Sequence, residues 1–398
     1  MSTAAFQPLV PEPRALASLL SQAADLIAEG HRLEAMAGRL SGTLAPLLRA
    51  MNSYYSNKIE GQQTRPLDIE RALHRQFDAD QRQAKRQRLA LAHIRAEQIL
   101  EGLLPTERTE LYSQKFVERI HAQLYLELPE TERLTDEGVK LVPGQLRSSQ
   151  VTAGQHSAPL ASEVPSLLAA WQAGYGSLPG LELAVVGVAC SHHRLLWVHP
   201  FPDGNGRAAR LHTHLLLGAF GLTQGLWSPL RGMARSQEAY YARLNNADLP
   251  RRNDLDGRGA LSQEELVAFA SWLLELCVDQ ARFMRDLLSL TSLKTRLHEL
   301  LLSLSATPWA IGSEHSVVKP EALEALHYAA LFGPIERARF MAMTGLPART
   351  ARRVLTSLLD YGILEAKTSR APVTFAVPLK SLRYVFPRLW PEAEQDLS

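Results

Sequence analysis

One twelve-residue segment, His199 to Arg210, combines residue types that could bind a phosphorylated ligand and move a proton. It reads HPFPDGNGRAAR. Its two prolines disfavour a helix, and its two glycines allow the backbone to turn with amide hydrogens exposed. An apolar pattern at helical spacing resumes at about Arg207, so the segment is predicted to lead into a helix N-terminus. Free N–H groups and the helix dipole at such a turn favour an anion such as phosphate.

Four side chains of this segment extend that chemistry. Arg207 and Arg210 are three residues apart, share a face of the first helical turn and offer two forked cations to phosphate oxygens. They oppose the helix dipole, so helix stability does not explain them. Asp203 offers a hard oxygen ligand to Mg²⁺, which commonly binds through one carboxylate and substrate phosphates. His199 can accept a proton near neutral pH.

The segment matches the signature of Fic-domain proteins, H-x-F-x-[D/E]-G-N-G-R-x-x-R, at every specified position. The chain resembles that family over about residues 15–290. Within that range, Pro143–Gly154, which includes Arg147 and Val151, resembles the family's target-docking flap. Ser236–Leu244 resembles the helix that follows the signature in the family.

The resemblance implies transfer of AMP from ATP to a Ser, Thr or Tyr hydroxyl of a target protein; transfer of another group such as UMP is less common in the family. His199 would be the general base, and Asp203 would hold Mg²⁺ across the α- and β-phosphates. Such a reaction needs positioning, charge neutralisation and one base. The remaining signature residues would bind the nucleotide: Gly204, Asn205 and Gly206 as an anion-binding loop, and Arg207 and Arg210 on the phosphates, with Arg210 toward the γ end.

Two tyrosines on the predicted helix 236–246 are further nucleotide-binding candidates. Tyr240 and Tyr241 could stack on adenine. A core position for at least one of the two rings is an equal alternative.

A second short motif, Ser56-Asn-Lys-Ile-Glu60-Gly61, fits the family's inhibitory pattern [S/T]-x-x-x-E-[G/N]. It lies N-terminal to the core, a placement that one class of the family uses. Glu60 stands in the last turn of a predicted helix, where a carboxylate opposes the dipole, so we expect a partner elsewhere. The resemblance implies that this partner is Arg210 and that the pair takes the γ-phosphate position. An ordinary solvated glutamate is the alternative.

These residues require a mainly helical scaffold. Helical spacing of apolar residues recurs from Ala15 to about Glu60 and over 163–174, 181–197, 207–220, 236–246 and 262–289. Residues 141–154 are β-tolerant and predict a small hairpin or extended flap. The predicted fold class is mainly α: a Fic helical bundle with a small β-hairpin flap, plus a C-terminal winged helix-turn-helix domain. The predicted domains are 1–110 (N-terminal helical region with the inhibitory helix), 111–290 (Fic catalytic core) and 291–398 (winged-helix domain).

The C-terminal hundred residues could carry a second function. Residues 335–378 predict helix, turn, helix, strand, turn and strand, which is typical of a winged helix-turn-helix. Between Arg337 and Arg388 there are ten Lys or Arg and two acidic residues. Arg349, Arg352 and Arg353 lie on the expected recognition helix, which favours DNA binding. Protein docking or dimerisation through the same domain is an equal alternative.

Chain-wide composition excludes other classes of protein. Of 398 residues, 46% are hydrophobic and 21% charged, typical of a soluble globular chain. The net charge of +2 implies no nucleic-acid or membrane partner for the chain as a whole. Two cysteines, Cys190 and Cys277, exclude a disulfide framework and favour a reducing cytosol. The N-terminus shows no signal-peptide pattern, and the most apolar run, near Leu181–Cys190, is too short to span a bilayer. We therefore expect a cytoplasmic protein without a membrane partner.

Four histidines flank the signature and could suggest a metal cluster: His192, His193, His212 and His214. We expect packed side chains instead, because no carboxylate or cysteine is seen to complete a ligand set.

Functions from two classes stay open. One is an autoinhibited protein adenylyltransferase that modifies a target protein or itself, with ATP and Mg²⁺; a bifunctional form would also remove AMP, with Glu60 positioning a water. The other is a DNA-binding transcriptional regulator whose Fic core is secondary. Intact His199 and Asp203 favour the enzyme. DNA and a second copy of the chain are further candidate partners.

Overall fold

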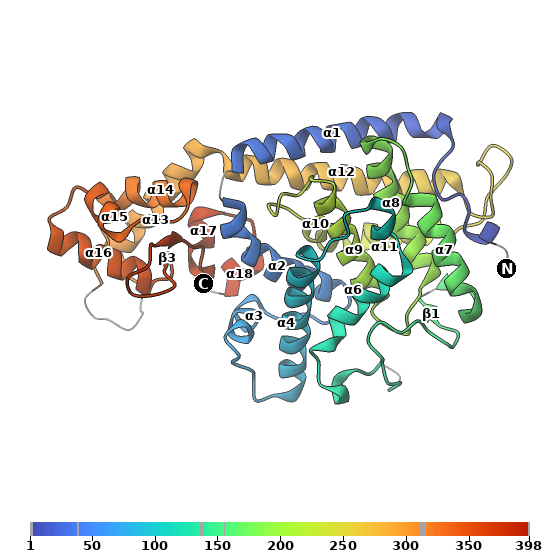
Figure 1. Ribbon diagram of the computed structural model, residues 1–398, viewed down its shortest axis with the longest axis horizontal. Helices are drawn as coiled ribbons and strands as arrows, with labels where there is room; N and C mark the ends of the chain where they lie inside the picture. The colour runs from blue at the N-terminus through green and yellow to red at the C-terminus, as the bar shows by residue number, and fades with distance from the viewer. Residues whose placement is uncertain (1–2, 38–39, 136–137, 155, 310–315, 397–398) are drawn as a thin grey trace.

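Long helices with one apolar face dominate the computed structural model, as the periodicity predicts (Figure 1). The structure describes residues 3–37, 40–135, 138–154, 156–309 and 316–396. Helix α1 (Pro13–Ala37) runs alongside α12 (Gln263–Leu288). Leu19, Ala23 and Leu26 recur at helical spacing and are fully buried. The first helix therefore packs along the last helix of the predicted core, and the predicted boundaries at 110 and 290 stay predictions.

Three further helices complete the N-terminal region: α2 (Leu40–Ile59), α3 (Pro66–Leu73) and α4 (Gln81–Glu101). Helix α2 packs against α4 and α10. It ends at Ile59, and Gly61 follows in the left-handed conformation (φ 71°), which glycine adopts without steric cost. Glu60 therefore lies at the very end of this helix, as predicted.

The central helices pack around the signature segment. They are α5 (Arg108–Leu111), α6 (Gln114–Leu126), α7 (Val164–Tyr175), α8 (Leu181–Val198), α9 (Asn205–Ala219), α10 (Pro229–Arg235) and α11 (Gln237–Ala247). Helix α8 contacts α7, α9, α1 and α12. Within the described residues it alone is long and apolar enough to cross a membrane, because it extends beyond the short apolar run seen in the sequence. However, 72% of it is buried inside the protein, as in the core helix of a soluble protein.

The flap is shorter and later than predicted. Strands β1 (Thr152–Ala153) and β2 (His156–Ser157) pair antiparallel, with Thr152 opposite Ser157. Residues 141–151 form turns and irregular backbone instead of a strand. Their β-tolerant composition does not specify a strand there, because their backbone N–H groups find partners outside a strand ladder: Leu141 donates to the Arg133 carbonyl, Gly144 to His121 Nδ1 and Arg147 to the Pro200 carbonyl.

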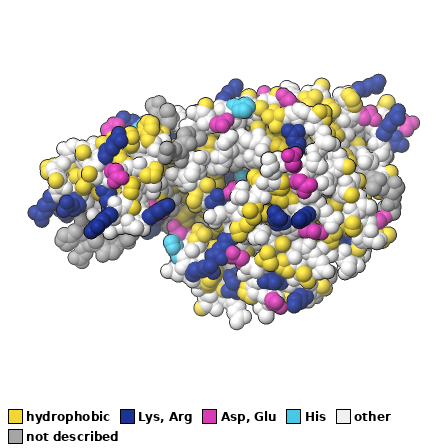
Figure 2. Space-filling model, in the orientation of Figure 1, with side chains coloured by type: hydrophobic (Ala, Val, Ile, Leu, Met, Phe, Trp, Pro, Cys, Tyr) yellow, Lys and Arg dark blue, Asp and Glu magenta, His cyan; other side chains and the backbone are white. Residues whose placement is uncertain are grey.

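The C-terminal elements follow the predicted order. They are α13 (Leu290–Ala306), α14 (Leu323–Phe332), α15 (Arg337–Met343), α16 (Ala348–Asp360), β3 (Leu364–Glu365), β4 (Thr374–Phe375), α17 (Leu382–Val385) and α18 (Pro391–Asp396). Helix α16 buries Ala351, Leu355 and Leu358 and exposes Arg352. Lys and Arg side chains lie on the surface of this end of the molecule and also elsewhere on the face shown (Figure 2). The winged-helix assignment and DNA binding stay predictions.

Candidate active site

The loop between α8 and α9 is held in one conformation by its own residues. His199 takes the left-handed conformation (φ 50°) directly after α8, and Gly204 takes it again (φ 79°) directly before α9. The side chain of Asn205 braces the turn between them: its amide donates to the Phe201 carbonyl (2.8 Å), and its oxygen accepts from the Phe201 N–H (2.9 Å). Helix α9 thus begins at Asn205, two residues earlier than predicted, and its first N–H groups have no partner within the helix.

His199 is oriented to use one ring nitrogen as a base. Its Nδ1 lies 3.3 Å from the Leu196 carbonyl, which favours the tautomer with the proton on Nδ1. Among the described residues, none forms a hydrogen bond with Nε2. Burial lowers the pKa of His199 to about 4, because the charged imidazolium is poorly solvated there. The ring is therefore neutral at physiological pH.

Asp203 has one carboxylate oxygen engaged by two side chains, and the carboxylate also accepts a hydrogen bond from the Gly204 backbone. Its Oδ2 accepts hydrogen bonds from the Tyr125 hydroxyl (2.9 Å) and from Arg207 Nη2 (3.1 Å). The structure gives Oδ1 no side-chain partner among the described residues. Burial raises the pKa of Asp203, but the Arg207 charge and the Tyr125 hydrogen bond outweigh burial, so the pKa lies below its ordinary value. An ionised carboxylate with one oxygen free of side-chain partners suits a hard cation such as Mg²⁺.

The expected contact between Glu60 and Arg210 is present. Arg210 Nη2 donates to Glu60 Oε1 at 2.5 Å, and the guanidinium also donates to the Ser56 hydroxyl and to the Ser56 carbonyl, both at 3.1 Å. Arg210 is only 1% exposed. Burial lowers its pKa, but the neighbouring Glu60 carboxylate outweighs burial and raises it, so the guanidinium stays charged. Ser56 and Glu60 therefore satisfy a buried cation.

The Glu60 carboxylate also lies against the first turn of α9. A Cβ atom added to Gly206 would collide with Glu60 Oε1 and would approach Arg210 Nη1. Gly206 is thus required for this close approach. The carboxylate occupies the place at the helix N-terminus where an anion is favoured.

The two candidate adenine-stacking tyrosines have different environments. Tyr240 is 1% exposed, its hydroxyl lies 2.8 Å from His192 Nε2, and its ring stacks on Trp272. This burial confirms the alternative of a core position for one of the two rings, and nucleotide binding by Tyr240 stays a prediction. Tyr241 is 40% exposed, and its hydroxyl donates to the Ile59 carbonyl at the end of α2 (2.9 Å). Nucleotide binding by Tyr241 stays a prediction.

The two candidate flap residues, Arg147 and Val151, also have different environments. Arg147 is buried and donates to four carbonyl groups: His199 (2.7 Å), Pro159 (2.6 Å), Ser149 (3.1 Å) and Val198 (3.4 Å). Its guanidinium holds the flap onto the loop, and the target-docking role of Arg147 stays a prediction. Val151 is partly exposed beside β1 and accepts from the Ala158 N–H, so its docking role stays a prediction.

The expectation that no carboxylate accompanies the histidines is wrong for His193, whose Nε2 lies 3.0 Å from Asp248 Oδ1, and for His214. Glu97 and Glu101 from α4 lie 3.4 and 3.7 Å from His214 Nε2, and these three side chains are close enough to share a cation. Burial lowers the pKa of His214, but the two carboxylates outweigh burial and raise the pKa to about 9. With Arg49 bound to Glu101 at 2.6 Å, the network is charge-neutral as it stands. His192, His193 and His212 are packed side chains, as expected.

Sequence reasoning missed two residues of α6 that support the loop. His121 stacks on Phe201 (3.9 Å between ring centroids), and its Nε2 lies 3.1 Å from the Asp203 carbonyl. Tyr125 binds Asp203 as described and also accepts from Arg207 Nη2 at 2.5 Å. Their spacing of four residues puts both on one face of a helix, which is the available sequence signal, but nothing in the sequence places that face against the loop.

Comparisons with known proteins agree with this geometry. Residues 111–217 match the model of the Fic/DOC family. Over 109 residues the chain is 31% identical to the protein named "Protein adenylyltransferase Fic" of Nematostella vectensis. That match covers 27% of this chain and 24% of the relative, so the chain spans about a quarter of the relative's length.

A solved structure of the family shares the fold. A Fic family protein from Desulfovibrio desulfuricans G20 has a TM-score of 0.51 at 18% identity, covering 94% of this chain and 99% of its own. A Fic domain containing signaling protein from Bacteroides thetaiotaomicron VPI-5482 has a TM-score of 0.49 at 17% identity, covering 67% and 97%. The family match includes α6, α8, the loop and most of α9, but it excludes α2 and everything beyond residue 217.

The environment of His199 predicts its titration. We expect the imidazole to stay neutral from pH 7 down to pH 5 and to take up its proton near pH 4, because burial disfavours the charged ring. NMR of the protein with isotope-labelled histidine measures this midpoint, and the spectrum of His199→Ala assigns the signal. A midpoint near the ordinary value of about 6.5 would contradict the buried position of the ring.

Proposed function

Residues 111–217 are a domain of the Fic/DOC family, and from this premise we propose that the chain is an autoinhibited protein adenylyltransferase. It would transfer AMP from ATP to a Ser, Thr or Tyr hydroxyl of a target protein or of itself. The observation that carries the proposal is the α8–α9 loop, where a neutral imidazole, an ionised carboxylate and a helix N-terminus with two arginines surround one turn. This is the set of groups that phosphoryl-type transfer from a nucleotide requires.

In the proposed reaction, a target hydroxyl oxygen attacks the α-phosphorus of ATP. Its proton passes to His199 Nε2, the bond to the β-phosphate oxygen breaks, and pyrophosphate leaves. Asp203 Oδ1 would hold Mg²⁺, which when bound neutralises charge on the α- and β-phosphates. The N–H groups at the start of α9 and the Arg207 guanidinium would orient the triphosphate. Arg147 fixes the His199 carbonyl, so the base keeps its position relative to the loop.

The position of Glu60 supports the proposed autoinhibition. The carboxylate pairs with Arg210 and lies over the N-terminus of α9, so a γ-phosphate bound at the same place would meet a like charge. ATP would then bind without its α-phosphorus in line with the target hydroxyl. Since Glu60 is 34% exposed while Arg210 is buried, displacement of the carboxylate toward solvent would open the site.

Labelling experiments test the activity. With α-³²P-ATP and Mg²⁺ the chain should incorporate label into itself or a target, and with γ-³²P-ATP it should not, because pyrophosphate leaves. His199→Ala should lower labelling by at least about 100-fold, the usual contribution of a general base. Equal labelling by the wild type and His199→Ala would contradict the proposal, and preferential labelling from α-³²P-UTP would change the transferred group.

Removal of the inhibitory carboxylate should activate the enzyme. Glu60→Gly should raise α-³²P-ATP labelling at least about tenfold, because a buried charged hydrogen bond of about 1.5–3 kcal/mol no longer competes with the γ-phosphate. The double variant Glu60→Gly/His199→Ala is the control and should show no labelling. Unchanged labelling in Glu60→Gly would show that the ion pair does not inhibit.

Tyr125 should position the metal-binding carboxylate. Tyr125→Phe removes the hydroxyl that donates to Asp203 Oδ2, so we expect the Mg²⁺ concentration for half-maximal labelling to rise about three- to tenfold. Binding of Mn²⁺ in the presence of ATP, measured by electron paramagnetic resonance, should weaken equally. Tyr112→Phe, a buried tyrosine packed on Trp171, is the control. An unchanged metal dependence would assign Tyr125 a purely structural role.

A further inference from the structure

The helix that carries the inhibitory motif has a second partner on its opposite side. Asn52, Ser56 and Glu60 are four residues apart and share the face of α2 that meets α4 and α9. Tyr54 and Lys58 are also four residues apart and lie on the opposite face. The last turns of α2 are therefore contacted from two directions.

The second partner is the short C-terminal helix α18. Glu392 Oε2 accepts a hydrogen bond from the Tyr55 hydroxyl (2.9 Å), and Glu392 Oε1 accepts one from the Lys58 ammonium (3.1 Å). The Trp390 ring, fully buried, meets the Tyr54 ring edge-on at 5.5 Å between centroids. In Figure 1, α18 lies beside α2, although the two helices are far apart in the sequence.

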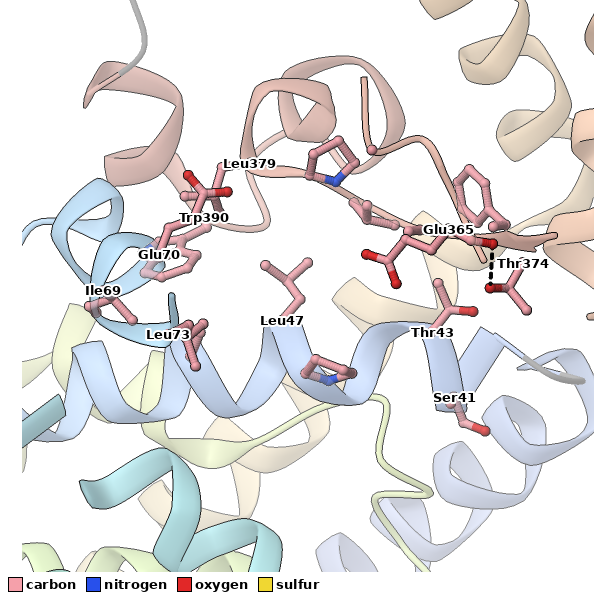
Figure 3. Close-up of a pocket in the computed structure, with 18 of the residues that line it drawn as sticks. Ser41, Thr43, Leu47, Ile69, Glu70, Leu73, Glu365, Thr374, Leu379 and Trp390 are labelled. Carbon is pink, nitrogen blue, oxygen red and sulfur yellow. Dashed lines mark hydrogen bonds between the residues drawn. The ribbon is translucent and has the colours of Figure 1, made fainter. Parts of the chain in front are cut away.

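Contact between α2 and the C-terminal elements is concentrated at this point. The hydrogen bonds from Tyr55 and Lys58 of α2 both end on Glu392. Nearer the start of α2, a cavity of about 980 Å³ separates the two parts. Leu47 of α2 and Leu73 of α3 line it on one side, and Leu379 and Trp390 line it on the other (Figure 3). The first half of α2 is thus loosely packed against these elements, whereas its last turns are tied to them.

The segment before α18 is in turn fixed to the central helices. Arg231 of α10 donates to the carbonyls of Arg388 (2.8 Å) and Leu389 (3.0 Å), and its guanidinium stacks over Phe283 of α12 at 4.2 Å. Buried guanidinium donors to backbone carbonyls are strong anchors. Helix α18 therefore presents Glu392 to α2 from a fixed position.

We propose that α18 is a latch on the inhibitory helix: Glu392 holds the last turns of α2 so that Glu60 stays on Arg210. This inference rests on the proposed autoinhibition. It makes the activity of the site depend on the C-terminal part of the chain, which lies outside the family match. An event that displaces α18 from α2 would release Glu60 without touching the nucleotide site.

Hydrogen exchange of the full chain tests the latch without any need for catalysis. In Glu392→Ala, amides of residues 50–60 should exchange about tenfold faster than in the wild type, because two hydrogen bonds to a carboxylate are lost. Tyr55→Phe removes one of the two and should give a smaller increase. Glu321→Ala, an exposed acidic residue of the C-terminal part, is the charge-matched control and should leave these amides unchanged. Unchanged exchange at 50–60 in Glu392→Ala would overturn the proposal.

Labelling with α-³²P-ATP tests the consequence for activity. Glu392→Ala should raise labelling about three- to tenfold, and it should add nothing in the Glu60→Gly background, because the latch acts only through Glu60. If Glu60→Gly raises labelling and Glu392→Ala does not, the latch is overturned while the proposed function stands. If Glu60→Gly also leaves labelling unchanged, the proposed autoinhibition fails, and the exchange data alone decide whether α18 restrains α2.

Discussion

A buried guanidinium must have hydrogen-bond acceptors beside it, and the candidate site depends on which anion accepts from Arg210. With 1% exposure, Arg210 cannot be solvated by water, and leaving it unpaired would cost several kcal/mol. In the structure Glu60 and Ser56 satisfy it. A phosphate group could satisfy it equally, because both ligands offer charged oxygens at the same helix N-terminus. One cation with two mutually exclusive partners is a two-state element.

The surrounding helices keep the other charges of the site in place while that exchange occurs. Asp203 and Arg207 are both fixed by Tyr125 of α6, and the turn is braced internally by Asn205. Arg147 ties the flap to the His199 carbonyl. None of these contacts involves Glu60, so the base, the carboxylate and the first turn of α9 are preorganised whether or not the inhibitory helix is in place.

How much the sequence predicts depends on how local each interaction is. The helices, the turn and the expected Glu60–Arg210 contact could be predicted, because apolar periodicity and two linear motifs carry them. The contact of Arg147 with the signature loop could not, since the His199 carbonyl that accepts its hydrogen bond lies 52 residues away in the sequence. The sequence also could not predict that Tyr240 is buried while the adjacent Tyr241 is exposed, because adjacent positions on a helix differ only in what packs against them. The carboxylates near His214 were missed for the same reason, since α4 supplies them.

The end of α2 is the point at which distant parts of the chain act on the same equilibrium. Arg210 of α9 holds its inner face, Tyr241 and Gln237 of α11 donate to the Ile59 carbonyl at its terminus, and Glu392 of α18 holds its outer side. In the proposed autoinhibition, each contact would favour the position in which Glu60 pairs with Arg210, and their free energies would act together on one population ratio. A change in any one of these elements would then shift the same ratio, by an amount set by its contact and not by its distance from the nucleotide site. Control of the site can thus reside in any part of the chain that touches α2.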